Sequence, residues 1–258
     1  MITYDRKAAQ NIERSYQTPE IIRQRLQTLS AMALRAGERV LDAGCGTGLL
    51  VETIAGIVGT SGSVVGIDCS NDMLDIARGR CADIAQVKLQ LGSVIQLEQA
   101  SDSFDAASCT QTLLYIDDVE AVLRELHRIL KPGGRIAILE TDWRGLVLNS
   151  ADDEMTVKIL KAWDHAVPSP NLPVKLTPLL RALNFSAIKV EAIPVLNTSY
   201  TADNFSASML KYFADNAVRQ NVISRAESKQ WLQNLVELEQ QDAYFFCVNR
   251  FLVTAVKS

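Results

Sequence analysis

The sequence has few of the residues that form disulfide frameworks, zinc sites or histidine-based catalytic centres. Its 258 residues include five cysteines and two histidines. No two cysteines form a C-x-x-C pair, and their odd number is typical of reduced thiols in the cytoplasm, not of a disulfide-linked secreted domain. No histidine and carboxylate pattern has the spacing of metal ligands, so we expect no metal site.

Long apolar runs and basic clusters are also missing. No apolar stretch approaches the roughly 20 residues that span a bilayer, and Met1–Lys7 lacks the apolar core of a signal peptide. We therefore expect a cytoplasmic protein with no membrane partner. The net charge is −4 and no lysine and arginine cluster is longer than a pair, which argues against binding to nucleic-acid phosphates. We expect no nucleic-acid partner, and a monomer or homodimer.

Between residues 39 and 140 the chain alternates strand-like and helix-like segments. This alternation predicts an α/β fold with a doubly wound, mostly parallel sheet. Helices are expected near 48–58, 71–82 and 118–130, the last of them ended by a proline and two glycines at 132–134. The expected strands are Arg39–Ala43, Ser63–Asp68, Val87–Leu91, Phe104–Cys109 and Gly134–Glu140.

The most informative segment is Val40–Gly48, a buried strand that runs into a glycine loop. Gly44, Gly46 and Gly48 alternate in it, so the backbone can turn tightly and approach a ligand closely. The helix that follows begins with free N–H groups, which suit a polar ligand group. The spacing is D-x-G-x-G-x-G and not the dinucleotide-binding G-x-G-x-x-G, because Leu49 stands where the last glycine would be. This spacing disfavours an NAD(P) oxidoreductase.

The next strand-like run ends in Asp68, about 20 residues beyond the loop, where an acid can accept hydrogen bonds from a ribose diol. With these features the chain resembles the class I S-adenosylmethionine (SAM) dependent methyltransferases, in particular the small-molecule branch that includes the ubiquinone and menaquinone methyltransferases. The resemblance covers residues 36–140. It implies a Rossmann-like, mostly parallel sheet of seven strands with an antiparallel last strand. The apolar runs 186–195 and 244–256 would form the closing pair of strands. It also implies SAM as the cofactor.

The resemblance also implies the residues that hold the cofactor. The three glycines would wrap the methionine part, and Asp42 would anchor the ammonium end or cap loop N–H groups. Asp68 would hold the ribose, and Cys69 and Met73 would lie against the adenine, unless Met73 is a plain core residue. The full predicted set is Asp42, Gly44, Cys45, Gly46, Gly48, Asp68, Cys69, Met73, Ser93, Val94, Thr110 and Gln111.

One position departs from the family pattern. After strand three the family usually has Gly-Asp, whose acid receives the adenine amino group, whereas this chain has Gly92-Ser93. A serine hydroxyl can accept that hydrogen bond but has no charge to strengthen it. We therefore expect backbone contacts from Ser93 and Val94 to contribute to adenine recognition.

Candidate catalytic residues follow strand five. Asp142 could orient a nucleophile or take its proton, and Trp143 could form a wall of the pocket or meet a cation with its ring face. The alternatives are a helix cap and a packed ring. His165 is a candidate general base, whereas His127 lies on a helix expected to be remote from the cleft. Tyr16 is a candidate lid residue.

Four parts of the chain are expected. The first is an N-terminal helical lid with an amphipathic run over 19–34, and the second is the SAM-binding core with a substrate-side insertion. A helical cap with helices near 203–219 and 224–240 separates the core from its last strand. The parts are residues 1–36 (lid), 37–196 (core, with the insertion at 141–180), 197–243 (cap) and 244–258 (last strand).

The predicted function is transfer of a methyl group from SAM to an O, N or C atom of a small molecule. The reaction is an in-line displacement in which the protein aligns the reactants and excludes water. Two alternatives remain open: a SAM-binding protein without transferase activity, which the serine at position 93 would fit, and a macromolecule methyltransferase, which the acidic composition disfavours. Aromatic residues in the lid, insertion and cap favour a small apolar or aromatic acceptor.

Overall fold

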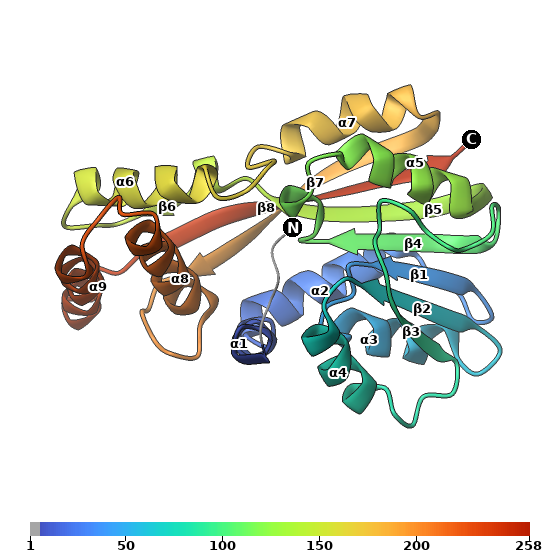
Figure 1. The fold of residues 1–258 in the computed structure, drawn as a ribbon, viewed down its shortest axis with the longest axis horizontal. Coiled ribbons are helices and arrows are strands. Elements are labelled where there is room, and N and C mark those ends of the chain that lie inside the picture. Colours follow the sequence, from blue (N-terminus) through green and yellow to red (C-terminus); the bar gives the residue numbers. More distant parts are fainter. Residues whose placement is uncertain (1–5) are drawn as a thin grey trace.

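Five parallel strands form the core of the molecule, in a sheet that helices cover on both faces (Figure 1). The computed structural model describes residues 6–258. The predicted strands are confirmed, although the fifth starts before the predicted Gly134 and pairs irregularly with its neighbour at this end. In spatial order the strands are β3 (Val87–Leu91), β2 (Ser63–Asp68), β1 (Arg39–Ala43), β4 (Phe104–Thr110) and β5 (Leu130–Thr141).

The far side of the sheet is antiparallel. β8 (Phe246–Lys257) lies between β5 and β7 (Phe185–Asn197) and runs opposite to both, which confirms the predicted antiparallel last strand. Within residues 6–258 the sheet has eight strands, where seven were predicted. The additional strand, β6 (Val147–Leu148), pairs with the start of β8 because β8 extends beyond the end of β5.

The helices that cover the sheet bury leucine, isoleucine and valine side chains against the strands. The three helices predicted between residues 48 and 130 are confirmed. On one face, Leu126 and Leu180 pack against the strands, and on the other Met32 and Ile54 do so. The helices of the first face are α5 (Val119–Ile129) and α7 (Pro173–Ala182), and those of the second are α2 (Pro19–Met32), α3 (Leu49–Val58) and α4 (Asn71–Arg80).

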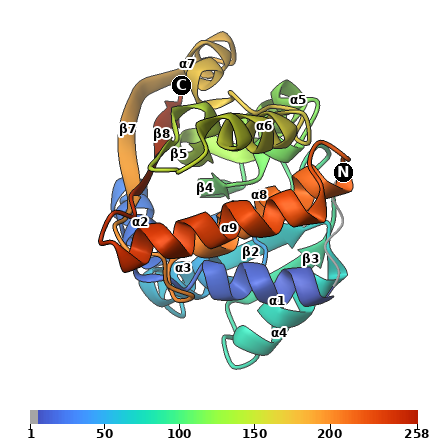
Figure 2. The ribbon, with the colours of Figure 1, turned by 90° about the vertical axis from the view of Figure 1, so that its left-hand side faces the viewer.

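A helical cap lies beside the core, next to the extended end of β8 (Figures 1 and 2). It contains the two helices predicted between the last strands, and a third helix from the insertion at 141–180. The cap has its own apolar cluster, in which the Phe213 ring lies 4.7 Å from Trp143 and 4.9 Å from Trp163. The cap helices are α6 (Asp153–Asp164), α8 (Phe205–Arg219) and α9 (Arg225–Gln240).

The two N-terminal helices take different places. α2 packs on the sheet as part of the core, whereas α1 (Arg6–Ser15) lies between α4 and α8. Glu13 of α1 forms an ion pair with Arg80 of α4, and the Ser15 and Ser208 hydroxyls are 2.8 Å apart. Within the described part, α1 therefore borders the cap whereas α2 belongs to the core, and a lid function of the N-terminal segment stays a prediction; residues 1–5 lie outside the described part. Among residues 6–258, no helix has the length and apolar character that a membrane crossing requires.

The aromatic cluster of the cap should be essential for stability. Replacing Phe213 by alanine removes a fully buried ring, so Phe213→Ala is expected to lower the free energy of unfolding by about 3–5 kcal/mol in urea titration. Lys211→Ala on the same helix, whose exposed ion pair with Asp215 is worth little, should change it by less than about 0.5 kcal/mol. Equal effects of the two substitutions would contradict this packing.

Candidate functional site

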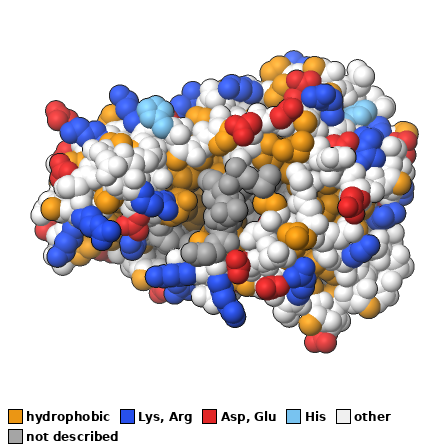
Figure 3. Space-filling view, viewed as in Figure 1, with side chains coloured by type: hydrophobic (Ala, Val, Ile, Leu, Met, Phe, Trp, Pro, Cys, Tyr) orange, Lys and Arg blue, Asp and Glu red, His pale blue; other side chains and the backbone are white. Residues whose placement is uncertain are grey.

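A cavity of about 1380 Å³ lies at the carboxyl ends of the parallel strands. This is the edge at which open α/β sheets bind ligands. The glycine loop and the ends of β2, β3 and β4 line one part of it, while α1, α8 and the loop before α8 line the other. On the face seen in Figure 3, hydrophobic side chains gather between cap and core, and basic side chains are interspersed with acidic ones.

The glycine loop has the backbone that its sequence predicts. Gly44 and Gly46 have φ angles of 76° and 53° and line the cavity. A Cβ on Gly44 would lie 2.2 Å from the Thr112 hydroxyl, whereas a Cβ on Gly46 would meet nothing within 4 Å. Gly48 does not line the cavity: its φ is 80° and a Cβ there would lie 3.0 Å from that of Ala77 on α4. The geometry therefore gives Gly48 a role in helix packing.

The Asp68 carboxylate lines the cavity and fixes the loop. One oxygen accepts a hydrogen bond from the Gly46 amide at 2.8 Å, and the other accepts one from the Ser70 amide at 2.9 Å. Burial raises the pKa of Asp68, and these backbone hydrogen bonds oppose the rise. The carboxylate joins the glycine loop to the end of β2 and presents its remaining lone pairs to a ligand.

Asp42 lies behind the loop, away from the main cavity. It is buried, and the Ser108 hydroxyl donates a hydrogen bond to it at 2.7 Å. Burial raises the pKa of Asp42 to about 7, and the negative charge of Asp68 contributes in the same direction. Asp42 and Cys45 line a recess of about 70 Å³, which shares Gly44, Gly46 and other lining residues with the main cavity.

The other predicted cofactor residues meet at the main cavity. Gln111 has a φ of 52°, an uncommon backbone for a non-glycine residue, and Thr141 donates a hydrogen bond to its side chain at 2.8 Å. The Ser93 hydroxyl accepts a hydrogen bond from the Ile95 amide at 3.3 Å. The predicted residues at this cavity, besides the two glycines and Asp68, are Cys69, Met73, Ser93, Val94, Thr110 and Gln111.

The structure brings one of the three candidate catalytic residues to the cavity. Trp143 lines it. Asp142 does not: its carboxylate caps the short helix η2 (Trp143–Gly145) and forms an ion pair with Arg144, which is the capping alternative. His165 is exposed at the end of α6 and does not line the cavity either. A role of Asp142 or His165 in proton transfer therefore has no geometric support.

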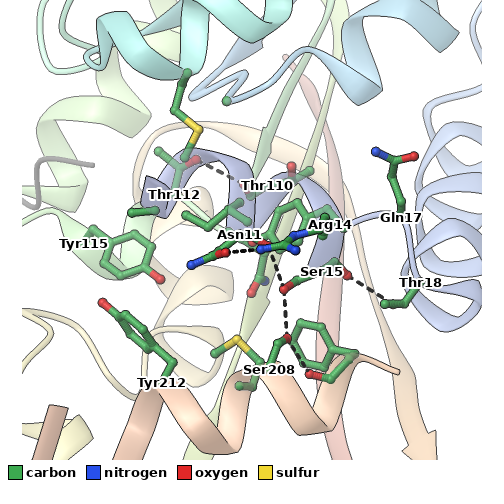
Figure 4. Close-up of a pocket in the computed structure, with 18 of the residues that line it drawn as sticks. Asn11, Arg14, Ser15, Gln17, Thr18, Thr110, Thr112, Tyr115, Ser208 and Tyr212 are labelled. Carbon is green, nitrogen blue, oxygen red and sulfur yellow. Dashed lines mark hydrogen bonds between the residues drawn. The ribbon is translucent and has the colours of Figure 1, made fainter. Parts of the chain in front are cut away.

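Sequence reasoning missed most of the lining from α1 and α8. Figure 4 shows Ser15 hydrogen-bonded to Ser208, and Tyr115 facing Tyr212 beside them. Tyr16, indicated as a lid residue, does line the cavity. Arg250 was missed as well, although an arginine in the middle of the apolar run 244–256 was the signal that could have revealed it. Among residues 6–258, no group of three or more metal-ligating side chains is found.

Glu140 is a buried acid beside the site. Its carboxyl accepts hydrogen bonds from the Thr112 and Leu113 amides at 2.9 and 2.7 Å, and so caps η1 (Leu113–Tyr115). Burial raises the pKa of Glu140 from 4.5 to about 8, against the opposing effect of these bonds and of Arg250. At neutral pH the protonated form therefore predominates.

Comparison with known proteins identifies the domain. Residues 34–199, more than half of the chain, match the family described as "Methyltransferase domain". The chain belongs to this family. An uncharacterised 37.1 kDa protein in transposon Tn4556 of Streptomyces fradiae is 30% identical to this methyltransferase domain protein over 229 residues, which is 88% of this chain and 65% of that protein.

Two further proteins are similar over different lengths. A 2-phytyl-1,4-naphtoquinone methyltransferase of Synechococcus elongatus is 40% identical over 111 residues, 42% of this chain and 48% of that protein. The chain thus spans less than two thirds of these curated relatives. A solved structure of phosphoethanolamine N-methyltransferase 2 from Haemonchus contortus, in complex with phosphomonomethylethanolamine and S-adenosylhomocysteine, aligns with a TM-score of 0.65 at 20% identity, covering 98% of this chain and 58% of that one. This likeness shows the common fold.

The two glycines of the loop that line the cavity, Gly44 and Gly46, allow a matched test of the loop. Gly46→Ala adds only the cost of a left-handed backbone, about 1–2 kcal/mol of unfolding free energy. Gly44→Ala adds the clash with Thr112 and should destabilise the methyltransferase domain by a larger amount. Chemical denaturation of both variants measures the difference. A loss at Gly44 no greater than that at Gly46 would contradict the close approach.

The buried acid gives a pH prediction. Because the folded-state pKa of Glu140 is raised to about 8, its contribution to stability is full below about pH 4.3, the pKa of an exposed glutamate. It is lost as the pH rises through 8. Glu140→Gln should reduce the loss of unfolding free energy between pH 5 and pH 9 by at least about 1 kcal/mol. Because the pKa of Asp42 is also raised, the unfolding free energy of Glu140→Gln should still fall somewhat as the pH rises. An unchanged slope in urea titrations would show that Glu140 is ionised throughout.

Proposed function

We propose that this protein is a SAM-dependent methyltransferase that transfers a methyl group to a small molecule. The observation that carries the proposal is that the glycine loop and Asp68 share one cavity with an aromatic compartment under the cap. The first half fits an adenosyl group and its amino-acid end, and the second half fits an acceptor. The methyltransferase-domain match supports the reaction class.

The residues of the first half suit the cofactor. Asp68 has lone pairs for the ribose hydroxyls, and the open space at Gly46 leaves room for a ligand against the backbone. Met73 and Val94 offer apolar contacts to an adenine ring, with Ser93 as a neutral hydrogen-bonding group beside them. Thr110 and Gln111 lie at the end of β4, next to the glycine loop, where the amino-acid end would bind.

The residues of the second half indicate the acceptor class. Aromatic and apolar side chains dominate there, and such a lining binds flat apolar molecules through their surface area. The hydroxyls of Tyr115 and Tyr212, which face each other in Figure 4, can orient a polar atom of the acceptor. The quinone methyltransferases among the relatives support an acceptor of this kind. The residues of this half include Tyr115, Trp143, Tyr200, Phe205, Met209, Tyr212 and Leu232.

The cavity suits a reaction that depends on alignment. SAM, when bound, supplies an activated methyl group, so the protein mainly holds the nucleophile in line and excludes water. Among the described residues that line the cavity there is no histidine and no glutamate. The acids there are Asp68, Asp203 and Asp215, and Asp215 is paired with Lys211. Because Asp68 belongs to the cofactor half, Asp203 is the remaining acid for proton transfer, and otherwise the acceptor atom is already deprotonated or releases its proton to water. A cytoplasmic location and a monomeric or homodimeric state remain predictions.

The proposal is tested by cofactor binding and by turnover. Asp68→Asn should weaken calorimetric binding of S-adenosylhomocysteine at least about tenfold, because charged hydrogen bonds to the ribose and to the loop are weakened. Asp75→Asn, an exposed acid of α4 paired with Arg78, should leave the affinity unchanged. A panel of phenols, hydroquinones and amines is then screened for S-adenosylhomocysteine formation. Cofactor binding without turnover on any acceptor would favour a SAM-binding protein, and no binding would refute the proposal.

A further inference from the structure

Arg250 lies on β8 with its guanidinium buried. The side chain is 1% exposed, and its central carbon lies 4.8 Å from the centre of the Phe205 ring and 5.8 Å from that of Tyr16. One terminal nitrogen donates a hydrogen bond to the Gln24 side chain. These neighbours are aromatic rings and a neutral amide, so none of them carries a charge that balances the guanidinium.

The charge of Arg250 has no direct counter-ion within the described part of the chain. No carboxylate lies within 4.0 Å of the guanidinium among residues 6–258, and its Nε has no hydrogen-bond partner there. Glu140 and Glu20 act on Arg250 only from a longer distance, and the raised pKa of Glu140 leaves that carboxyl mainly protonated at neutral pH. A buried cation without an ion pair is costly. An anionic group of a ligand would remove that cost.

Arg250 lines the place where such a group fits. It borders both the main cavity and the small recess of about 70 Å³ behind Gly44. Asp42 and Arg25 line the same recess, so an acid and two arginine side chains border a space only large enough for a small polar group. The Arg25 guanidinium already donates a hydrogen bond to the backbone carbonyl of Tyr16 at 3.2 Å. This combination is complementary to the ammonium and carboxylate of an α-amino acid. Within the described part, no residue of α8 lines the recess, which separates it from the aromatic compartment.

We propose that Arg250 binds the α-carboxylate of the amino-acid end of SAM, an inference that rests on the proposed function. The guanidinium borders the recess and offers the carboxylate N–H groups beyond the one bonded to Gln24, and charged hydrogen bonds of this kind are short and strong. β8 thereby joins the glycine loop in fixing the cofactor, because in the strand order β8 and the Asp68-bearing β2 lie on either side of β1, β4 and β5. Arg250 is a positioning residue for the sulfonium, because the carboxylate it holds is linked to the sulfur.

Two product analogues isolate the carboxylate. S-adenosylhomocysteine carries it, and the decarboxylated analogue S-adenosyl-3-thiopropylamine keeps the amine and lacks only the carboxylate. Calorimetry on the wild-type protein should give about 10- to 100-fold tighter binding of the first than of the second. In Arg250→Met this preference should fall to near unity through loss of S-adenosylhomocysteine affinity, while the affinity for the decarboxylated analogue stays within about twofold. Arg250→Lys, which keeps the charge, should retain part of the preference.

A matched control and the wild-type protein make the test decisive. Arg39, at the start of β1, also has its guanidinium over a ring, that of Phe104 at the start of β4. Arg39→Met should leave both affinities unchanged. Equal binding of the two analogues by the wild-type protein would overturn the inference without any variant. An undiminished preference in Arg250→Met would do so as well. If the wild-type protein binds neither analogue, the proposed function is refuted, and this inference, which rests on it, is refuted as well.

Discussion

The pairing of β8 along both of its edges fixes the position of the cap relative to the core. One edge pairs with β5 and then with β6, and the other pairs with β7 over its whole length. Phe246 and Val248, near the start of the strand, belong to the aromatic cluster of the cap. Further along, Leu252 and Val253 point to opposite faces of the sheet. The cavity between core and cap therefore depends on the register of this one strand.

The sheet and the helices packed on it keep ionisable groups in buried positions around the cavity. Burial raises the pKa of Asp42 and Glu140 and lowers that of Arg250. Groups with perturbed pKa values cluster at functional sites because a ligand gains most from charges that water does not screen. The aromatic compartment, by contrast, offers hydroxyls and ring faces. Binding of charged groups at one end and alignment of an apolar acceptor at the other are thus separated within a single cavity.

Much of the fold followed from local signals. The runs ending in Ala43 and Asp68 gave two strands with correct bounds, because a strand buried on both faces has a mostly apolar sequence. The strand ending in Leu91 was also given correct bounds, although it lies at the edge of the sheet, is only partly buried and alternates apolar and polar residues. The additional strand β6 was not predictable: two residues carry no periodicity, and they pair only because β8 extends past β5. Likewise, the amphipathic pattern of α2 indicated a helix but not that it packs on the sheet.

By itself, the sequence determined the glycine loop, the acid at the end of the second strand and the alternation that makes the sheet parallel, since each depends on residues close together in the chain. Only the tertiary structure decided which side chains reach the cavity. It turned Asp142 toward Arg144 and left His165 on the surface, while it brought Tyr16, Tyr212 and Arg250 together from three distant segments. The reason is physical: a side chain's partners across a cavity are set by helix packing and strand register, which no single segment encodes.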